Sequence, residues 1–223
     1  GNTIEEMFIG LWSDPDLGYA GDDFVGCDTT LSLGYCYNDG ADADYGTAAP
    51  AIGYDFFQGP IVPSVGDTAF AFGRYIPDYK NLGMSSFTKY INGDPVYADP
   101  NDAIEAYNYM SGYLRNGQPY INSATGEPGM FVHPDDPNDN TDANDDVWVD
   151  SDDHASGDRR FLMNAGPFTL KARSDVDEDN GAGLDSQEVV FGILIAQGAD
   201  HLSSVTLLKQ IDVLAQTAYD VQF

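Results

Sequence analysis

The sequence is poor in positive charge. Of 223 residues, 9 are Lys or Arg and 37 are Asp or Glu, which gives a formal net charge of −28. A surface with this excess of carboxylates repels the phosphate backbone of nucleic acids and anionic lipid. We therefore exclude both as partners and expect surroundings of high salt, abundant calcium or a cationic partner.

Cysteines and long apolar runs are also scarce. The chain has two cysteines, Cys27 and Cys36, and no Cys or His cluster with the spacing of a zinc site. A disulfide across a hairpin and a pair of small buried thiols both fit this spacing. No stretch approaches the roughly 20 apolar residues that a membrane-spanning helix needs, so we expect no membrane insertion.

Motifs of catalysis are missing as well. The sequence contains no GxSxG, no HExxH, and no Walker or dinucleotide-binding glycine pattern. Pairs of carboxylates can hydrolyse glycosides, but 37 acidic residues produce such pairs by chance. For His133 and His154, which lie in an acidic segment, we favour ordinary surface positions over a metal role or a raised pKa. We expect that the protein is not an enzyme.

What is present is typical of a folded chain. Hydrophobic residues make up 42% and aromatic residues 13%. The 24 Gly, the 14 Tyr and the many Asp residues favour strands joined by structured loops. We expect one β-rich domain over residues 1–223. The chain opens with a strand-like stretch, "GNTIEEMFIGLWSD", so we interpret it as a mature or excised piece of a longer secreted protein.

Apolar periodicity predicts the elements. Strands are expected over 3–12, 29–37, 159–173 and 186–198, and a strand near 68–75 after irregular chain from residue 51. The near-continuous apolar run 189–196 predicts a strand covered on both faces. Helical spacing predicts helices near 101–116 and 203–221, capped by Asp102 and by Ser203 or Ser204. The expected fold is an antiparallel β-sandwich, mainly β, with long acidic loops and two helices.

Two loops crowd carboxylates in the way that calcium sites do. Calcium takes 6–8 oxygen ligands, and alternating aspartates supply several of them from one loop. The loop that begins at Asp175 resembles an EF-hand, although Asn180 and Ser186 stand where an EF-hand has Gly and Glu. The alternative is a solvated acidic turn. The Ca²⁺ ligands that we predict are Asp14, Asp16, Asp22, Asp23, Asp175, Asp177 and Asp179.

The most acidic segment spans residues 133–158. It holds ten Asp and no Lys or Arg, a composition that alone favours disorder. If the segment is ordered, the order has to come from bound cations, from a neighbouring subunit or from packing around Val147, Trp148 and Val149.

Several stretches resemble a known kind of protein. The stretches "DPDLGYAGDDFVGCDTTLSLGYCYN", "APAIGYDFFQGPIV" and "GDRRFLMNAGPFTL" resemble a recurrent region of large secreted and cell-surface proteins of Bacteroidota-type Gram-negative bacteria, many of them associated with type IX secretion. The resemblance implies export and carries no activity. Where a short "PGDSQE" turn is expected, this chain has "KARSDVDEDNGAGLDSQE", so the resemblance does not support ligands at 175–179.

Two functions follow as hypotheses. The first is a non-enzymatic extracellular structural protein at the cell surface, stabilised by calcium, that builds a surface assembly or filament with its own copies or with other surface proteins. The alternative is a glycan-binding or glycan-processing accessory domain. Its platform would be the aromatic residues of 54–59 and 107–120.

Overall fold

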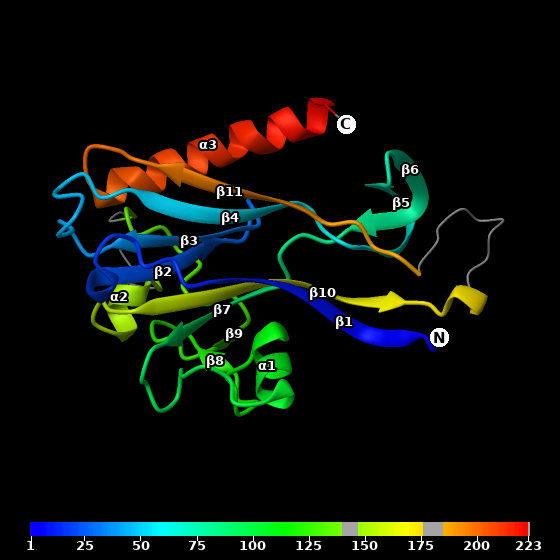
Figure 1. The fold of residues 1–223 in the computed structure, drawn as a ribbon, viewed down its shortest axis with the longest axis horizontal. Coiled ribbons are helices and arrows are strands. Elements are labelled where there is room, and N and C mark those ends of the chain that lie inside the picture. The colour runs from blue at the N-terminus through cyan, green and yellow to red at the C-terminus, as the bar shows by residue number, and fades with distance from the viewer. Residues whose placement is uncertain (140–146, 176–184, 223) are drawn as a thin grey trace.

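The computed structural model describes residues 1–139, 147–175 and 185–222, and its fold is mainly β, as predicted. Two antiparallel sheets stack face to face (Figure 1). The three-stranded sheet has the order β1-β10-β7, and its strands are β1 (Ile4–Ser13), β10 (Arg159–Leu170) and β7 (Ser86–Ile91). The four-stranded sheet has the order β11-β4-β3-β2, and its strands are β11 (Val190–Ala196), β4 (Ala51–Gln58), β3 (Leu33–Asn38) and β2 (Asp23–Asp28).

Smaller elements surround the two sheets. A hairpin of β5 (Ile61–Ala71) and β6 (Arg74–Asn81) stands at one end of the molecule, and β8 (Tyr120–Ile121) pairs with β9 (Pro128–Gly129) near α1. The helices are α1 (Ala103–Met110), the short α2 (Asp150–Asp153) and α3 (His201–Gln222), and the 3₁₀ turns are η1 (Ala20–Asp22) and η2 (Arg173–Asp175). Within the described residues, no helix is long and apolar enough to cross a membrane.

The main core lies between the two sheets. Phe161 and Met163 alternate with outward residues along β10 and are fully buried, and Phe161 stacks on Phe87 of β7 with ring centroids 5.4 Å apart. Gly34 of β3 lies against this layer, and a Cβ atom there would come within 2.7 Å of the Phe87 ring. The two sheets therefore approach closely enough that a larger residue at position 34 would displace the aromatic layer.

A second core lies between the four-stranded sheet and α3. The buried side chains Val205 and Leu208 of α3 pack on Leu33, Tyr35 and their neighbours, so α3 covers the outer face of this sheet (Figure 1). The buried apolar positions of α3 lie in its first half. A buried hydrogen bond from the Ser204 hydroxyl to the Ala49 carbonyl, 2.7 Å long, holds the beginning of the helix.

Both long helices differ in extent from their predictions. Helix α1 is capped by Asp102, as predicted, but it ends at Met110, because the chain turns at Gly112 with a φ of +85°. Helix α3 begins two residues earlier than predicted. Its capping contact is made by Asp200, whose carboxylate accepts from the Ser203 N–H at 2.7 Å.

The stretch 51–75 was predicted wrongly. Residues 51–58, expected to be irregular, form strand β4 between β3 and β11. The strand expected near 68–75 is interrupted by a hairpin turn at Phe72 and Gly73, both with positive φ, that joins β5 to β6. Gly59 and Pro60 follow directly on β4, which ends at Gln58.

The last strand was also misjudged. Burial along β11 alternates, and the side chains of Phe191, Ile193 and Ile195 are 47%, 55% and 64% exposed. Helix α3 covers one face of β11, and the exposed Phe191, Ile193 and Ile195 lie on the other face. An apolar run in the sequence predicts a strand, but it does not predict whether other elements of the fold cover both faces of that strand.

The two cysteines are free and buried. In the β2–β3 register Cys27 lies opposite Gly34, and Cys36 lies opposite Val25, so the two thiols are diagonal neighbours. Of the two interpretations left open by the sequence, the structure has the pair of buried thiols.

Candidate functional site

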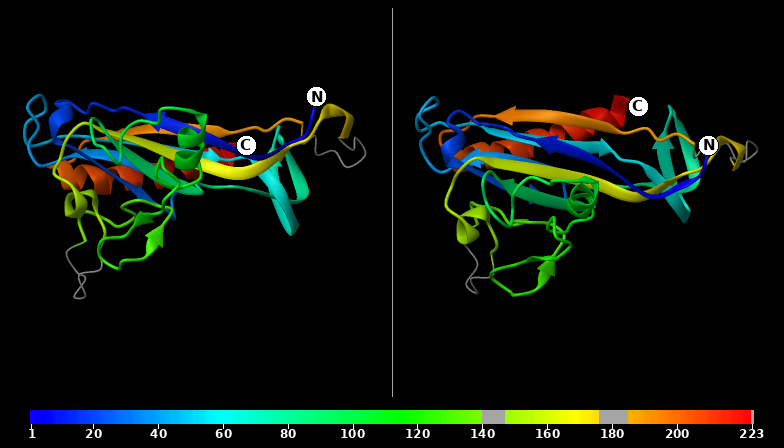
Figure 2. Two further views of the ribbon diagram at one scale, coloured as in Figure 1. Left: turned by 90° about the horizontal axis from the view of Figure 1, so that it is seen from below. Right: turned by 60° about the horizontal axis from the view of Figure 1, so that its bottom comes forward.

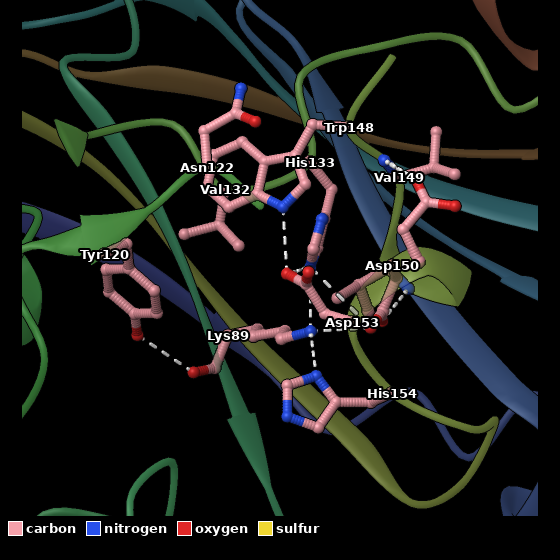
Figure 3. Close-up of polar contacts among 12 residues, drawn as sticks. Lys89, Tyr120, Asn122, Val132, His133, Trp148, Val149, Asp150, Asp153 and His154 are labelled. Carbon is pink, nitrogen blue, oxygen red and sulfur yellow. Dashed lines mark hydrogen bonds and ion pairs between the residues drawn. The ribbon is translucent and has the colours of Figure 1, made fainter. Parts of the chain in front are cut away.

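A buried polar cluster holds the acidic segment against the sheets (Figure 3). At its centre is Lys89, whose side chain points inward from β7 and is fully buried. Its Nζ donates to Asp150 Oδ1 at 2.6 Å, and it contacts His133 Nε2 at 2.7 Å and His154 Nδ1 at 3.1 Å. The acid and the two histidines all belong to segment 133–158, so one lysine of the sheet binds three points of that segment.

The geometry assigns the protons. Three acceptors surround Nζ and match the three N–H groups of an ammonium ion. In this arrangement each histidine accepts through a ring nitrogen that carries no proton, so both rings are neutral. Consistent with this, burial and the charge of Lys89 lower the pKa of His133 to about 3 and lower that of His154. His133 is 1% exposed, so our prediction of an ordinary surface position for it was wrong.

Asp150 binds two cations at once. Its Oδ2 accepts from Arg159 Nε and from the Val25 N–H, each at 3.0 Å. Burial alone would raise the pKa of Asp150, but the charges of Lys89 and Arg159 lower it to about 2. This carboxylate is therefore ionised and fully paired, which is the condition under which a buried charge is tolerated.

Further contacts, made by Trp148, join residues on the two sides of the polar cluster. Trp148 donates its backbone N–H to Asp135 at 2.7 Å and its indole N–H to Asp153 at 2.8 Å. Its ring packs on His133 with centroids 5.0 Å apart. Because Lys89, Asp150 and Arg159 are closed off from solvent, the cluster suits holding residues 133–139 and 147–158 in place better than chemistry on a substrate.

A second acidic cluster lies at the surface and contains two of the predicted calcium ligands. Asp14 and Asp16 meet Asp158, with ligand oxygens all within 4.8 Å of one another. Arg160 reaches this cluster through Asp14 at 2.9 Å. One buried oxygen of Asp14 and one of Asp158 have no hydrogen-bond partner, so the residues present fit a divalent cation that takes oxygen ligands.

Asp22, Asp23 and Asp175, which were also predicted as ligands, do not belong to this group. Asp22 accepts from the Asn38 side-chain amide at 2.7 Å. Asp23 is fully buried and accepts from the Leu17 N–H, and burial raises its pKa to about 7. The side chains of Asp175 and Thr3 are hydrogen-bonded at 3.1 Å. Asp177 and Asp179 lie outside the described residues.

The sequence reasoning missed Lys89 and Arg159. A signal was available, because the chain has only nine basic residues and one of them interrupts an otherwise uncharged strand, "SFTKYI". A lysine in such a strand is either solvent-facing or paired in the interior. The sequence offered no way to choose its partner among ten aspartates in the acidic segment.

A further feature is an apolar row that nothing covers among the described residues. Phe191, Ile193 and Ile195 lie on the face of β11 that looks toward the three-stranded sheet, on the same side as Tyr54 and Ile52 of the neighbouring β4. Within the described part of the chain, β1 pairs only with β10, and β11 only with β4. Figure 2 shows β11, in orange, running along the edge of the stacked sheets.

The row is exposed because the sheets differ in width. The Ser13 hydroxyl of β1 donates to the Tyr54 hydroxyl of β4 at 3.2 Å, and Phe161 of β10 meets the Tyr54 ring with centroids 5.5 Å apart, so both strands reach β4 across the core. On the side of β1 away from β10, no described strand is paired, and the three-stranded sheet is one strand narrower than the sheet that contains β11. We call Phe191, Ile193 and Ile195 the open row.

Comparison with known proteins found no match: no family model, no curated protein and no solved structure is similar to this chain.

Proposed function

We propose that the protein is a non-enzymatic structural subunit of an extracellular surface assembly, stabilised by calcium, in which copies associate through the open row. The observation that carries this proposal is the open row, together with an edge of β1 that is paired with no described strand. Three large apolar side chains at alternate positions form a continuous strip, and strips of this kind on soluble proteins mark interaction surfaces.

The spacing of the open row favours an extended strand as the segment that binds there. A strand added to β1 would supply partners for the backbone groups of that edge, and its alternate side chains would lie over Phe191, Ile193 and Ile195. We propose that a second copy of this chain donates that strand. The occupied sandwich would then have four strands in each sheet.

In this proposal calcium reduces the electrostatic repulsion between two acidic copies of the chain. Two copies that each carry a net charge of −28 repel one another, and divalent cations reduce this repulsion. The cluster of Asp14, Asp16 and Asp158 is the candidate site, because its oxygens without partners suit calcium. Asp14 follows directly on β1, so an ion there would also fix one end of the edge strand.

The test is the state of association of the purified chain. We expect sedimentation velocity to find oligomers when calcium is in excess and to find mostly monomers in chelator. The double variant I193K/I195K introduces two charges into the open row, and its association constant should fall by at least about tenfold.

The matched control is L214K/V221K, which adds the same two charges at apolar positions of α3 that are 68% and 78% exposed. This control should associate like the wild type. A wild type that stays monomeric with excess calcium at high protein concentration would overturn the proposal. Equal association of the two variants would also overturn it, because net charge alone would then explain the behaviour.

A further inference from the structure

A cleft lies where residues of the β5–β6 hairpin meet residues of the C-terminal end of α3 and of the end of β4. In Figure 1 this hairpin and α2, which carries Asp150, stand at opposite ends of the molecule. Its volume is about 270 Å³. Its walls combine four aromatic rings with two amides and one carboxylate. The lining residues are Phe57, Gln58, Phe70, Tyr75, Asn81, Tyr219 and Asp220.

The aromatic rings form two pairs. Phe57 and Tyr219 are stacked, with centroids 5.7 Å apart and an interplanar angle of 24°. Phe70 and Tyr75 meet edge to face at 5.2 Å and 62°. Tyr75 remains 73% exposed, so its ring presents a flat apolar surface to solvent at the cleft. Each ring is supported by another, which limits the side-chain entropy lost when a ligand binds.

The amides of the cleft are held in fixed orientations. Asn81 accepts from the Phe70 N–H and donates to the Phe70 carbonyl, both at 2.9 Å. Gln58 accepts from the Tyr219 hydroxyl at 2.7 Å and donates to Glu188 at 3.0 Å. Their amide oxygens each have a second lone pair, so both can accept a further hydrogen bond from a ligand.

The carboxylate of Asp220 adds to these acceptors. Its Oδ1 accepts from the Gln216 side-chain amide at 2.7 Å, and an ionised carboxylate has about four acceptor positions. The cleft therefore offers oxygen acceptors beside apolar ring faces. A ligand that matches it has hydroxyl groups along its edges and an apolar face, and it carries no negative charge, since Asp220 and Glu188 would repel an acidic one.

We infer that this cleft binds a neutral oligosaccharide. A pyranose ring has apolar C–H faces that pack on an aromatic ring and hydroxyl groups that donate to amide and carboxylate oxygens. The exposed ring of Tyr75 is the stacking platform, and Asn81, Gln58 and Asp220 receive the hydroxyls. This inference stands apart from the association through the open row, because no lining residue belongs to that row.

The test is isothermal titration calorimetry with four hexasaccharides: cellohexaose, mannohexaose and xylohexaose as neutral probes and an alginate hexasaccharide as the acidic probe. We expect binding of at least one neutral probe and none of alginate. The variant Y75A removes a mostly exposed ring without opening a core, and it should weaken the binding by about tenfold. The control Y45A removes a tyrosine that is 47% exposed and does not line the cleft, and it should bind like the wild type.

Three outcomes would overturn the inference. The first is no binding of any neutral probe, the second is equal binding by Y75A and the wild type, and the third is alginate binding as tight as that of the neutral probes. The measurements can be made on I193K/I195K as well as on the wild type. Failure of the association proposal would therefore leave the result on the cleft unaffected.

Discussion

Asp150 and Asp55 are both fully buried, yet their charges differ. Asp150 lies between Lys89 and Arg159, and these cations hold its pKa at about 2. Asp55, on β4, faces Asp212 of α3, and burial together with this second carboxyl group raises its pKa to about 9. Burial by itself does not decide the charge of an aspartate in this protein. The groups that contact the aspartate decide its charge. A chain with nine basic residues can supply a cation to only a few of its 37 acidic residues.

The Asp55–Asp212 pair depends on a proton. Neither oxygen of Asp55 has a donor among the described residues, and two ionised carboxylates accept but do not donate. Burial also raises the pKa of Asp212, to about 6. One carboxyl group must therefore stay protonated while α3 packs on β4. A proton makes this contact possible, whereas cations make the burial of Asp150 possible.

The largest expected effect comes from removing the ammonium ion of the polar cluster. The variant K89M leaves Asp150 buried with one cation in place of two and removes a donor from His133 and His154. Breaking a buried pair from one side costs about 3–5 kcal/mol, so we expect a loss of that size in the free energy of unfolding. Urea melts measure it, and limited proteolysis should find new cleavage within residues 133–158.

The control for this change is K209M. Lys209 pairs with Asp28 and Asp136 at 3.3 and 3.0 Å, but these groups are partly exposed, so the loss should be about 0–1 kcal/mol. The double variant K89M/D150N should be less stable than K89M, because it also leaves the buried Arg159 without its counter-charge. If K89M were no more destabilising than K209M, the polar cluster would not be what orders the acidic segment.

The next effect concerns calcium at the surface cluster, where carboxylates outnumber cations. Ligand at 100 times its dissociation constant stabilises by about 2.7 kcal/mol per site, which raises the melting midpoint by several degrees. We expect this rise for the wild type in excess calcium relative to chelator. The variant D158N should lose most of it, and E5Q, which removes one charge outside the cluster, should keep it. A wild-type midpoint that is identical in calcium and chelator would rule out the site.

How far the sequence predicts these regions depends on whether a feature is local. Alternating apolar residues predict β1 and β10, and Asp102 correctly predicts the start of α1, because both signals reside in neighbouring residues. The pairing of Lys89 with Asp150 joins residues 61 positions apart, and many aspartates compete for that lysine in the sequence. Only the fold selects one of them.

The candidate site shows the same limit. The calcium role of Asp14 and Asp16 stays a prediction, and the third carboxylate of their cluster, Asp158, lies at the C-terminal end of the acidic segment, where no pattern in the sequence connects it with them. The open row was misread for a related reason. The apolar run 189–196 predicts a strand, whereas its exposure follows from the different widths of two sheets.

The smallest expected effect is a difference in how stability depends on pH for the two kinds of buried aspartate. The pKa of Asp150 is depressed, so its contribution to stability is present above the ordinary value near 3.8 and is lost as the pH falls toward about 2. The pKa values of Asp55 and Asp212 are raised. Their contribution is fully present below 3.8 and is lost as the pH rises through about 6 and then about 9.

The variant D212N isolates the second contribution, because a carboxamide can donate to Asp55 and carries no charge. We expect D212N to be more stable than the wild type at pH 8 by roughly 1–3 kcal/mol, because the second carboxyl group no longer opposes the ionisation of Asp55. The difference should shrink toward zero at about pH 4, where the wild-type pair is largely protonated. The control D220N removes a charge from the exposed side of the same helix and should leave the slope of stability against pH unchanged. Urea melts across this pH range measure all three proteins. Parallel pH profiles for D212N and the wild type would mean that the pair holds no shared proton, and that α3 tolerates two charges beneath it.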